Sequence, residues 1–238
     1  MTAVIRIADL NIGLEEPIGT WLEKYYRPYL APEGCQVDFS VRVTMDELYA
    51  EQAASGERFM PSLQWSCMHR HICEKLPEYD AFMLHAAVVA VDGHAYAFSA
   101  KSGTGKSTHL MLWRKLLGDR MTVINGDKPI LRYLDGRLYV YGTPWAGKEN
   151  LQTNTRAELS GLCFLERGAE NRIEPLAPEA AALRVMHQVY RQKDPIMLSK
   201  QLDMIDDMLH RVPLWLLHCD ISDQAAALSY QTMHGAAD

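Results

Sequence analysis

AKSGTGKS, residues 100–107, is the stretch that decides the fold of this chain. It fits the phosphate-loop pattern of a small residue, four spacers and then Gly-Lys-Ser/Thr. Gly103 and Gly105 allow the backbone to curl so that successive N–H groups point at an anion. Lys106 can then reach the β- and γ-phosphates of a nucleotide, and Ser107 can offer its hydroxyl to Mg²⁺. The run that follows predicts a helix whose positive N-terminal end faces the same phosphates.

The strand expected before this loop belongs to a hairpin. Two β-rich segments, residues 83–91 and 94–100, are separated by Asp92-Gly93. Asp-Gly between such segments is the strongest short-range signal for a hairpin. The strand that enters the loop is therefore predicted to be the second arm of an antiparallel hairpin. An ordinary phosphate-loop NTPase enters its loop from a strand of a parallel βαβ sheet, so the pattern points away from GTPases and ATPase motors.

The hairpin, the loop and the next strand together resemble HPr kinase/phosphorylase and phosphoenolpyruvate carboxykinase. In HPr kinase/phosphorylase a histidine starts the hairpin and an aspartate pair lies on the strand after the loop, and here His85 and Gly126-Asp127 fall at those places. The resemblance covers residues 83–131 by motif and the rest of the C-terminal part more loosely. The chain departs from the pattern twice: Ala100 opens the loop in place of Gly, and Gly126 replaces the first aspartate.

The resemblance implies a mixed α/β (α+β) fold of the phosphoenolpyruvate carboxykinase/HPr kinase-like type, with an antiparallel hairpin leading into the phosphate loop. We expect an N-terminal α+β part over residues 1–78, packed on a nucleotide-binding core over 79–238. Strands are predicted at 4–12, 37–43, 121–125, 129–134, 137–141, 159–166 and 213–218, and helices at 17–28, 45–54, 63–75, 178–191, 194–211 and 223–233. Thr44-Met-Asp-Glu47 is a capping box, and Asp135-Gly136 repeats the hairpin signal.

The activity implied by the resemblance is that of an ATP- and Mg²⁺-dependent kinase that transfers the γ-phosphate to a hydroxyl. The implied acceptor is a serine or threonine of a small protein or peptide, and a small metabolite is the alternative. A phosphorylase or carboxykinase-type lyase ranks lower. A nucleotide-binding regulator that has lost catalysis stays open because Gly126 leaves one carboxylate where the family has two. Members of the family assemble as homo-oligomers, which the resemblance implies here as well.

Three residues are predicted to be catalytic: Lys106, Asp127 as base and metal ligand, and His85, which would orient Asp127 if it lies nearby. Ser107 and Asp127 are the predicted Mg²⁺ ligands. The alternatives are that Asp127 caps the strand end and that His85 pairs with the backbone. The residues predicted to bind ATP are Lys101, Ser102, Gly103, Thr104, Gly105, Lys106, Ser107 and Thr108. Lys128 is expected to point to the opposite face of a strand from Asp127.

Residues 142–149 are predicted to form a substrate loop made mobile by Gly142 and Gly147. In it Trp145 would supply an apolar face, and Lys148 and Glu149 would supply charge. Arg156, just beyond the loop, would bind a phosphate or an acceptor carboxylate. The alternative is a long connection exposed to solvent.

Composition limits the other classes of function. The chain has 238 residues and a formal net charge of −6, which gives no reason to expect nucleic acid or an anionic membrane surface as partner. No stretch approaches the ~18 apolar residues of a membrane span. The five cysteines are odd in number and form no Cys-x-x-Cys, so they predict reduced thiols in a cytoplasmic protein. His69, His71 and Cys73 have metal-ligand chemistry, but neighbours two apart on a helix point away from each other.

Overall fold

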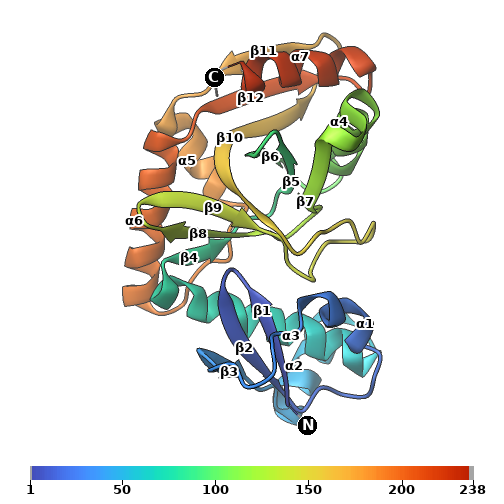
Figure 1. Ribbon diagram of the computed structural model, residues 1–238, viewed down its shortest axis with the longest axis vertical. Helices are drawn as coiled ribbons and strands as arrows, with labels where there is room; N and C mark the ends of the chain where they lie inside the picture. The colour runs from blue at the N-terminus through green and yellow to red at the C-terminus, as the bar shows by residue number, and fades with distance from the viewer. Residues whose placement is uncertain (1, 236–238) are drawn as a thin grey trace.

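The computed structural model of the chain describes residues 2–235 and contains two β-sheets. The smaller sheet lies in the N-terminal part, drawn in blue at the bottom of Figure 1, and the larger sheet forms the body above it. Both sheets mix parallel and antiparallel pairs and are accompanied by helices. The mixed α+β class predicted from the sequence is confirmed at this level.

In the N-terminal part, β1 and β2 form an antiparallel hairpin and β3 pairs with β2 in parallel. The capping box is confirmed, because the Thr44 hydroxyl accepts a hydrogen bond from the Glu47 amide and the Glu47 carboxylate accepts one from the Thr44 amide. The elements are β1 Thr2–Ile7, β2 Leu10–Glu15, α1 Glu23–Tyr26, η1 Arg27–Tyr29, β3 Phe39–Val41, α2 Met45–Ser55, α3 Met60–Lys75 and η2 Leu76–Tyr79.

Two predictions for this part are wrong. Residues 4–12 form a hairpin rather than one strand, because the chain turns at Ala8 and Asp9, which have φ values of 52° and 54°. No glycine marks that turn, and apolar residues alternate on both sides of it. The helix expected over 17–28 is reduced to the four residues of α1 and the three of η1. Gly19, with φ of +66°, interrupts the helical conformation before them.

The larger sheet has nine strands among residues 2–235, in the order β4-β8-β9-β10-β6-β5-β7, with β12 beside β10 and β11 beside β12. The long strand β10 is parallel to β6 and β12 and antiparallel to β9, so it forms the centre of the sheet. The elements are β4 Ala81–Met83, β5 Ala87–Val91, β6 His94–Ser99, α4 Lys106–Leu117, η3 Gly118–Arg120, β7 Met121–Asn125, β8 Ile130–Leu134, β9 Arg137–Tyr141, β10 Arg156–Arg167, β11 Arg172–Pro175, α5 Pro178–Met186, α6 Pro195–Arg211, β12 Leu214–Cys219 and α7 Asp223–His234.

Both predicted Asp-Gly hairpins are confirmed as the antiparallel pairs β5–β6 and β8–β9. In each turn the Asp and the Gly both have positive φ, which is the geometry of a two-residue hairpin loop whose twist matches that of the strands. The first arm is shorter than predicted, because residues 81–83 form the separate strand β4, which pairs with β8. This break places His85 in the short connection between β4 and β5.

Helices cover both faces of the larger sheet, as Figure 1 shows, with α5 and α6 on one side and α4 and α7 on the other. A third apolar cluster joins the N-terminal part to this body, since Met83, Ile130, Tyr141 and Trp145 pack among side chains of β1, β2 and α3. The boundary expected between residues 78 and 79 falls inside η2 and stays a prediction. Across residues 2–235, none of the helices has the length and apolar character that a membrane crossing would need.

Candidate functional site

The predicted phosphate loop connects the end of β6 at Ser99 with the start of α4 at Lys106. Gly103 and Gly105 have φ values of +78° and +124°, which residues with side chains rarely adopt. The amides of Ser102, Gly103 and Gly105 donate no hydrogen bond within the described part of the chain. Unused amide donors beside the N-terminus of a helix are what a bound anion needs.

Two side chains hold this loop from within the protein. The buried Lys106 ammonium donates a hydrogen bond to the carbonyl of Ala100 at 3.1 Å, and the Arg167 guanidinium donates one to the carbonyl of Gly103 at 2.7 Å. Burial lowers the pKa of Lys106, and the nearby Asp127 carboxylate acts in the opposite direction. A partly desolvated cation is thus kept inside the loop, where a bound anion would offset the free-energy cost of burying its charge.

Asp127 is held by the strand that precedes it. β7 ends at Asn125, and the buried Asn125 side-chain oxygen accepts hydrogen bonds from the amides of both Asp127 and Lys128, each at 2.8 Å. The Asn125 amide nitrogen donates in turn to the backbone carbonyl of Thr143 at 2.9 Å. Asn125 therefore fixes the turn that presents Asp127, a role that the sequence analysis missed.

The structure brings His85 and Asp127 together, with 3.0 Å between His85 Nε2 and Asp127 Oδ1. The side chains are 28% and 25% exposed, so both can be reached from solvent. Burial alone would raise the pKa of Asp127. The His85 hydrogen bond, with the charges of His85, Lys128 and Lys106, outweighs it and leaves that pKa below its ordinary value. Asp127 is consequently an ionised carboxylate at neutral pH.

Gln188 fixes the other side of the histidine ring. Its side-chain oxygen lies 2.8 Å from His85 Nδ1, and its backbone carbonyl accepts the His85 amide at 2.6 Å. Gln188 follows α5 and is 103 residues from His85, so no local pattern could have predicted it. The row Gln188–His85–Asp127 determines how the Asp127 carboxylate is oriented.

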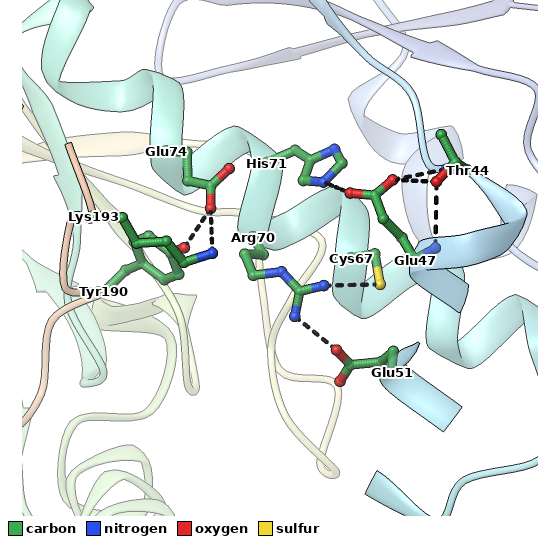
Figure 2. Close-up of polar contacts among 9 residues, drawn as sticks. All are labelled: Thr44, Glu47, Glu51, Cys67, Arg70, His71, Glu74, Tyr190 and Lys193. Atoms are coloured by element: carbon green, nitrogen blue, oxygen red, sulfur yellow. Dashed lines mark hydrogen bonds and ion pairs between the residues drawn. The ribbon is translucent and has the colours of Figure 1, made fainter. Parts of the chain in front are cut away.

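The segment that carries Gln188 is tied to α3 in the N-terminal part. Figure 2 shows Glu74 accepting a hydrogen bond from Tyr190 at 2.7 Å and pairing with Lys193 at 3.4 Å. In the same view Glu47 of α2 joins Thr44 to His71 of α3. The N-terminal helices therefore support the connection between α5 and α6 that positions His85.

Gly126 stands where the resemblance expects an aspartate, and packing explains the glycine. A Cβ added there would lie 3.2 Å from the Ala146 carbonyl oxygen and 3.3 Å from that of Leu151. The Gly126 amide also donates a hydrogen bond to the Leu151 carbonyl at 2.8 Å. A Cβ at position 126 would thus face the connection between β9 and β10.

The predicted substrate loop is only partly exposed. A Cβ at Gly142 would lie 1.9 Å from the Thr153 carbonyl oxygen, so this glycine permits close packing rather than mobility. Trp145 is buried and stacks on Trp65 of α3 at 4.4 Å between ring centroids. Lys148 and Glu149 are exposed on a turn that touches Asp127 through Gly147, where an added Cβ would lie 3.0 Å from Asp127 Cβ.

Arg156 does not join the other predicted residues. It begins β10, whose opposite end at Arg167 contacts the phosphate loop, and the two ends are about 35 Å apart along the strand. The Arg156 guanidinium instead pairs with Asp9 and donates to the Tyr141 hydroxyl at 3.0 Å. Arg156 therefore holds the β1–β2 turn against the larger sheet, and its role in binding a phosphate or an acceptor stays a prediction.

Lys128 does not lie where the sequence predicted it. Its expected position on the face opposite Asp127 assumed a continuing strand, but β7 ends at Asn125 and residues 126–129 form an irregular turn. Asp127 and Lys128 consequently line the same small cavity, of about 130 Å³.

Two larger cavities flank the phosphate loop, of about 420 and 440 Å³. The first is lined by Lys101 and Thr104 of the loop and by Gln188, and the second by Gly103, Thr104 and Thr108. The predicted nucleotide-binding residues therefore border spaces large enough for parts of a nucleotide.

Few side chains of the described residues are placed to coordinate Mg²⁺. Within residues 2–235, no group of three His, Cys, Asp or Glu side chains is placed to hold a metal ion. Mg²⁺ keeps several waters and is often held by one or two protein oxygens plus substrate phosphates. The Ser107 hydroxyl and the Asp127 carboxylate fit that requirement. His69 and Cys73 approach each other to 3.6 Å, whereas His71 pairs with Glu47, so these three do not form a metal site.

No protein-family model matches the chain, and no curated protein matches it. Among solved structures, the chain is similar to the Hpr(Ser) kinase/phosphatase from Coxiella burnetii, with a TM-score of 0.33 and 12% sequence identity over 64% of this chain and 93% of that one. This is a distant structural relationship and does not assign the chain to a family.

Proposed function

We propose that this protein is an ATP- and Mg²⁺-dependent kinase that transfers the γ-phosphate to a hydroxyl group. The observation that carries the proposal is that Lys106, in a strand–loop–helix with unused amide donors, lies close enough to Asp127 for each charge to shift the pKa of the other, and that His85 orients this ionised carboxylate. Phosphoryl transfer requires that the triphosphate is held, its charge balanced and the acceptor oxygen aligned. These groups supply the required chemistry.

The loop amides and Lys106 bind the phosphates, with the N-terminus of α4 adding a favourable dipole. When bound, Mg²⁺ would balance the phosphate charge, with Ser107 and Asp127 as protein ligands. Asp127 Oδ1 is engaged by His85, so Oδ2 would serve the metal and the acceptor in turn, and for the acceptor it takes first the hydrogen bond and then the proton of the hydroxyl. The hydroxyl oxygen forms the new P–O bond as the bond to ADP breaks, and the proton passes from Asp127 to solvent.

Serine or threonine of a small protein or peptide is the acceptor class suggested by the sequence resemblance, with a small metabolite as the alternative. A second candidate is a nucleotide-binding regulator without transferase activity. Gly126 favours it, because it leaves one carboxylate at this place in the chain and an added Cβ would pack tightly against Ala146 and Leu151. We place catalysis first because a regulator has no need for the ordered His85–Asp127 pair.

The test is ADP formation from Mg²⁺-ATP by the wild type and by Asp127→Asn, together with ATP affinity by calorimetry. The Asn side chain keeps the volume and the contact with His85 but cannot take a proton. We expect turnover to fall by at least 10²-fold while ATP affinity stays within a few-fold. Turnover within a few-fold of wild type would exclude Asp127 as the base, and tight ATP binding without turnover in the wild type would favour the regulator.

A further inference from the structure

The small cavity beside Asp127 lies between the N-terminal part and the larger sheet. Its walls come from α1, α3, the turn after β7 and the connection between β9 and β10. None of its lining residues belongs to the phosphate loop. Asp127 lines this cavity and neither of the two cavities beside the phosphate loop, so a group bound here would reach Asp127 from a different space than the nucleotide, as an acceptor must in an in-line transfer.

Lys128 gives this cavity a positively charged lining residue. The residue is half-buried, and its ammonium forms no ion pair or hydrogen bond within the described residues, although its charge contributes to the low pKa of Asp127. An ammonium without an ion-pair or hydrogen-bond partner can form a charge-assisted contact with an anion bound in the cavity.

The remaining walls are aromatic. Trp145 stacks on Trp65, and Tyr25 lies 6.2 Å from Trp65 between ring centroids. The Trp145 indole N–H already donates to the Trp65 carbonyl at 3.2 Å, so this ring offers apolar surface rather than a free donor. The volume of about 130 Å³ accommodates a fragment of about three or four carbons.

We propose that this cavity is the acceptor subsite and that it takes a small hydroxyl-bearing group with an anionic group beside the hydroxyl. The hydroxyl lies at Asp127, the anion at Lys128 and the carbon chain against Tyr25, Trp65 and Trp145. In a peptide acceptor, the anion is the side chain of an acidic residue next to the serine. This inference rests on the proposed kinase activity and specifies its substrate class.

The experiment measures ADP formation with two matched pairs of acceptor probes, glycerate against glycerol and acetyl-Asp-Ser-amide against acetyl-Asn-Ser-amide. Members of a pair have nearly the same size and differ in charge. Tryptophan fluorescence is followed in parallel, because Trp65 and Trp145 line the cavity. The variants are Lys128→Met and Lys128→Arg, and Lys200→Met, an exposed lysine of α6, is the matched control.

We expect the anionic member of at least one pair to stimulate ADP formation at least ten-fold more than its neutral partner. Lys128→Met should abolish this preference by raising KM for the anionic probe, while Lys128→Arg and Lys200→Met should retain it. The inference is wrong if neutral probes do as well, if Lys128→Met keeps the preference, or if no probe changes turnover or fluorescence while Mg²⁺-ATP still binds. Failure to bind Mg²⁺-ATP at all would instead overturn the proposed function.

Discussion

Asp127 is positioned by residues both near to it and distant from it in the chain. Asn125 fixes its turn, His85 holds one of its oxygens, and Gln188 holds His85. An aspartate after an apolar strand is an ordinary turn residue, and what distinguishes this one is its set of partners. A carboxylate whose pKa is kept low stays ionised and can hold an acceptor hydroxyl before transfer begins.

Lys106→Ala tests the phosphate loop. The substitution removes a buried ammonium whose hydrogen bond within residues 2–235 is to the Ala100 carbonyl, so the fold should persist. Nucleotide affinity should fall by about 1.5–3 kcal/mol, or roughly ten- to 150-fold, because a charge-assisted contact to phosphate is lost. Calorimetric titration with Mg²⁺-ATP measures this loss. Unchanged affinity would show that the loop does not bind the phosphates.

Gln188→Leu tests the orientation of His85. Without the Gln188 oxygen, His85 loses the partner of its Nδ1 and holds Asp127 less well, so the pKa of Asp127 should rise toward its ordinary value. Activity that needs the ionised carboxylate is then lost at a higher pH as the solution is acidified. We expect kcat to fall several-fold, the acid limb of the pH profile to move upward and KM for ATP to stay constant.

The control for that variant is Gln188→Glu, which keeps an oxygen facing His85 Nδ1 and should restore most of the wild-type acid limb. A loss of activity with an unmoved acid limb in Gln188→Leu would mean that Gln188 serves stability alone.

At the scale of elements, the connection between β9 and β10 follows β7 closely. Its residues pair with the end of β7, since the Thr153 amide donates to the Ile124 carbonyl and the Gly126 amide donates to the Leu151 carbonyl. The stretch therefore behaves as packed structure over most of its length, and only the turn with Lys148 and Glu149 is exposed. Two glycines make this approach possible.

Gly142→Ala and Gly126→Ala form a graded test of this packing. The added methyl would meet the Thr153 carbonyl oxygen at 1.9 Å in the first variant and the Ala146 carbonyl oxygen at 3.2 Å in the second. Backbone oxygens cannot rotate aside, so both variants should lose stability, by about 1–3 kcal/mol, with Gly142→Ala the larger loss. Urea unfolding monitored by circular dichroism measures both, and a reversed order would contradict the close packing at Gly142.

The features that could be predicted from the sequence are those whose signals span only a few residues. Asp-Gly turns, the Thr44 capping box and the loop glycines act over a few residues, and the structure contains the hairpins and the cap as predicted. The turn at Ala8 and Asp9 carries no glycine and was missed. His85 and Asp127 were expected together only through the family resemblance. Gln188, the buried Trp145 and the direction of Lys128 depend on tertiary contacts, which no local pattern encodes.

The whole molecule is organised around α3. Its side chains enter the apolar cluster of the N-terminal part, Trp65 stacks on Trp145, and the Cys73 carbonyl accepts a hydrogen bond from Gln192 at 2.7 Å. α3 thereby contacts the β9–β10 connection, which borders Asp127, and the α5–α6 connection, which holds His85. Disturbance of α3 should consequently affect the site as well as stability.

His69 of α3 gives this organisation a pH dependence. The ring is buried against Trp145, 4.9 Å between centroids, and burial lowers its pKa from 6.5 to about 3. Between pH 6.5 and pH 3, His69 is therefore protonated in the unfolded chain and neutral in the folded chain. The free energy of unfolding consequently falls as the pH drops through this range. His109 of α4, with a pKa lowered to about 4 by burial, acts in the same direction.

Unfolding free energy measured in urea at pH 7 and pH 5 isolates this effect, because carboxylates with ordinary or lowered pKa values stay ionised at both. Each of the two histidines contributes at most about 1.4 kcal/mol per pH unit below 6.5, or about 2 kcal/mol by pH 5. His69→Leu keeps the volume of the side chain and removes the group that can be protonated. The variant should therefore lose less unfolding free energy between pH 7 and pH 5 than the wild type, by up to this amount. Equal losses in the two proteins would show that His69 takes up its proton without unfolding α3.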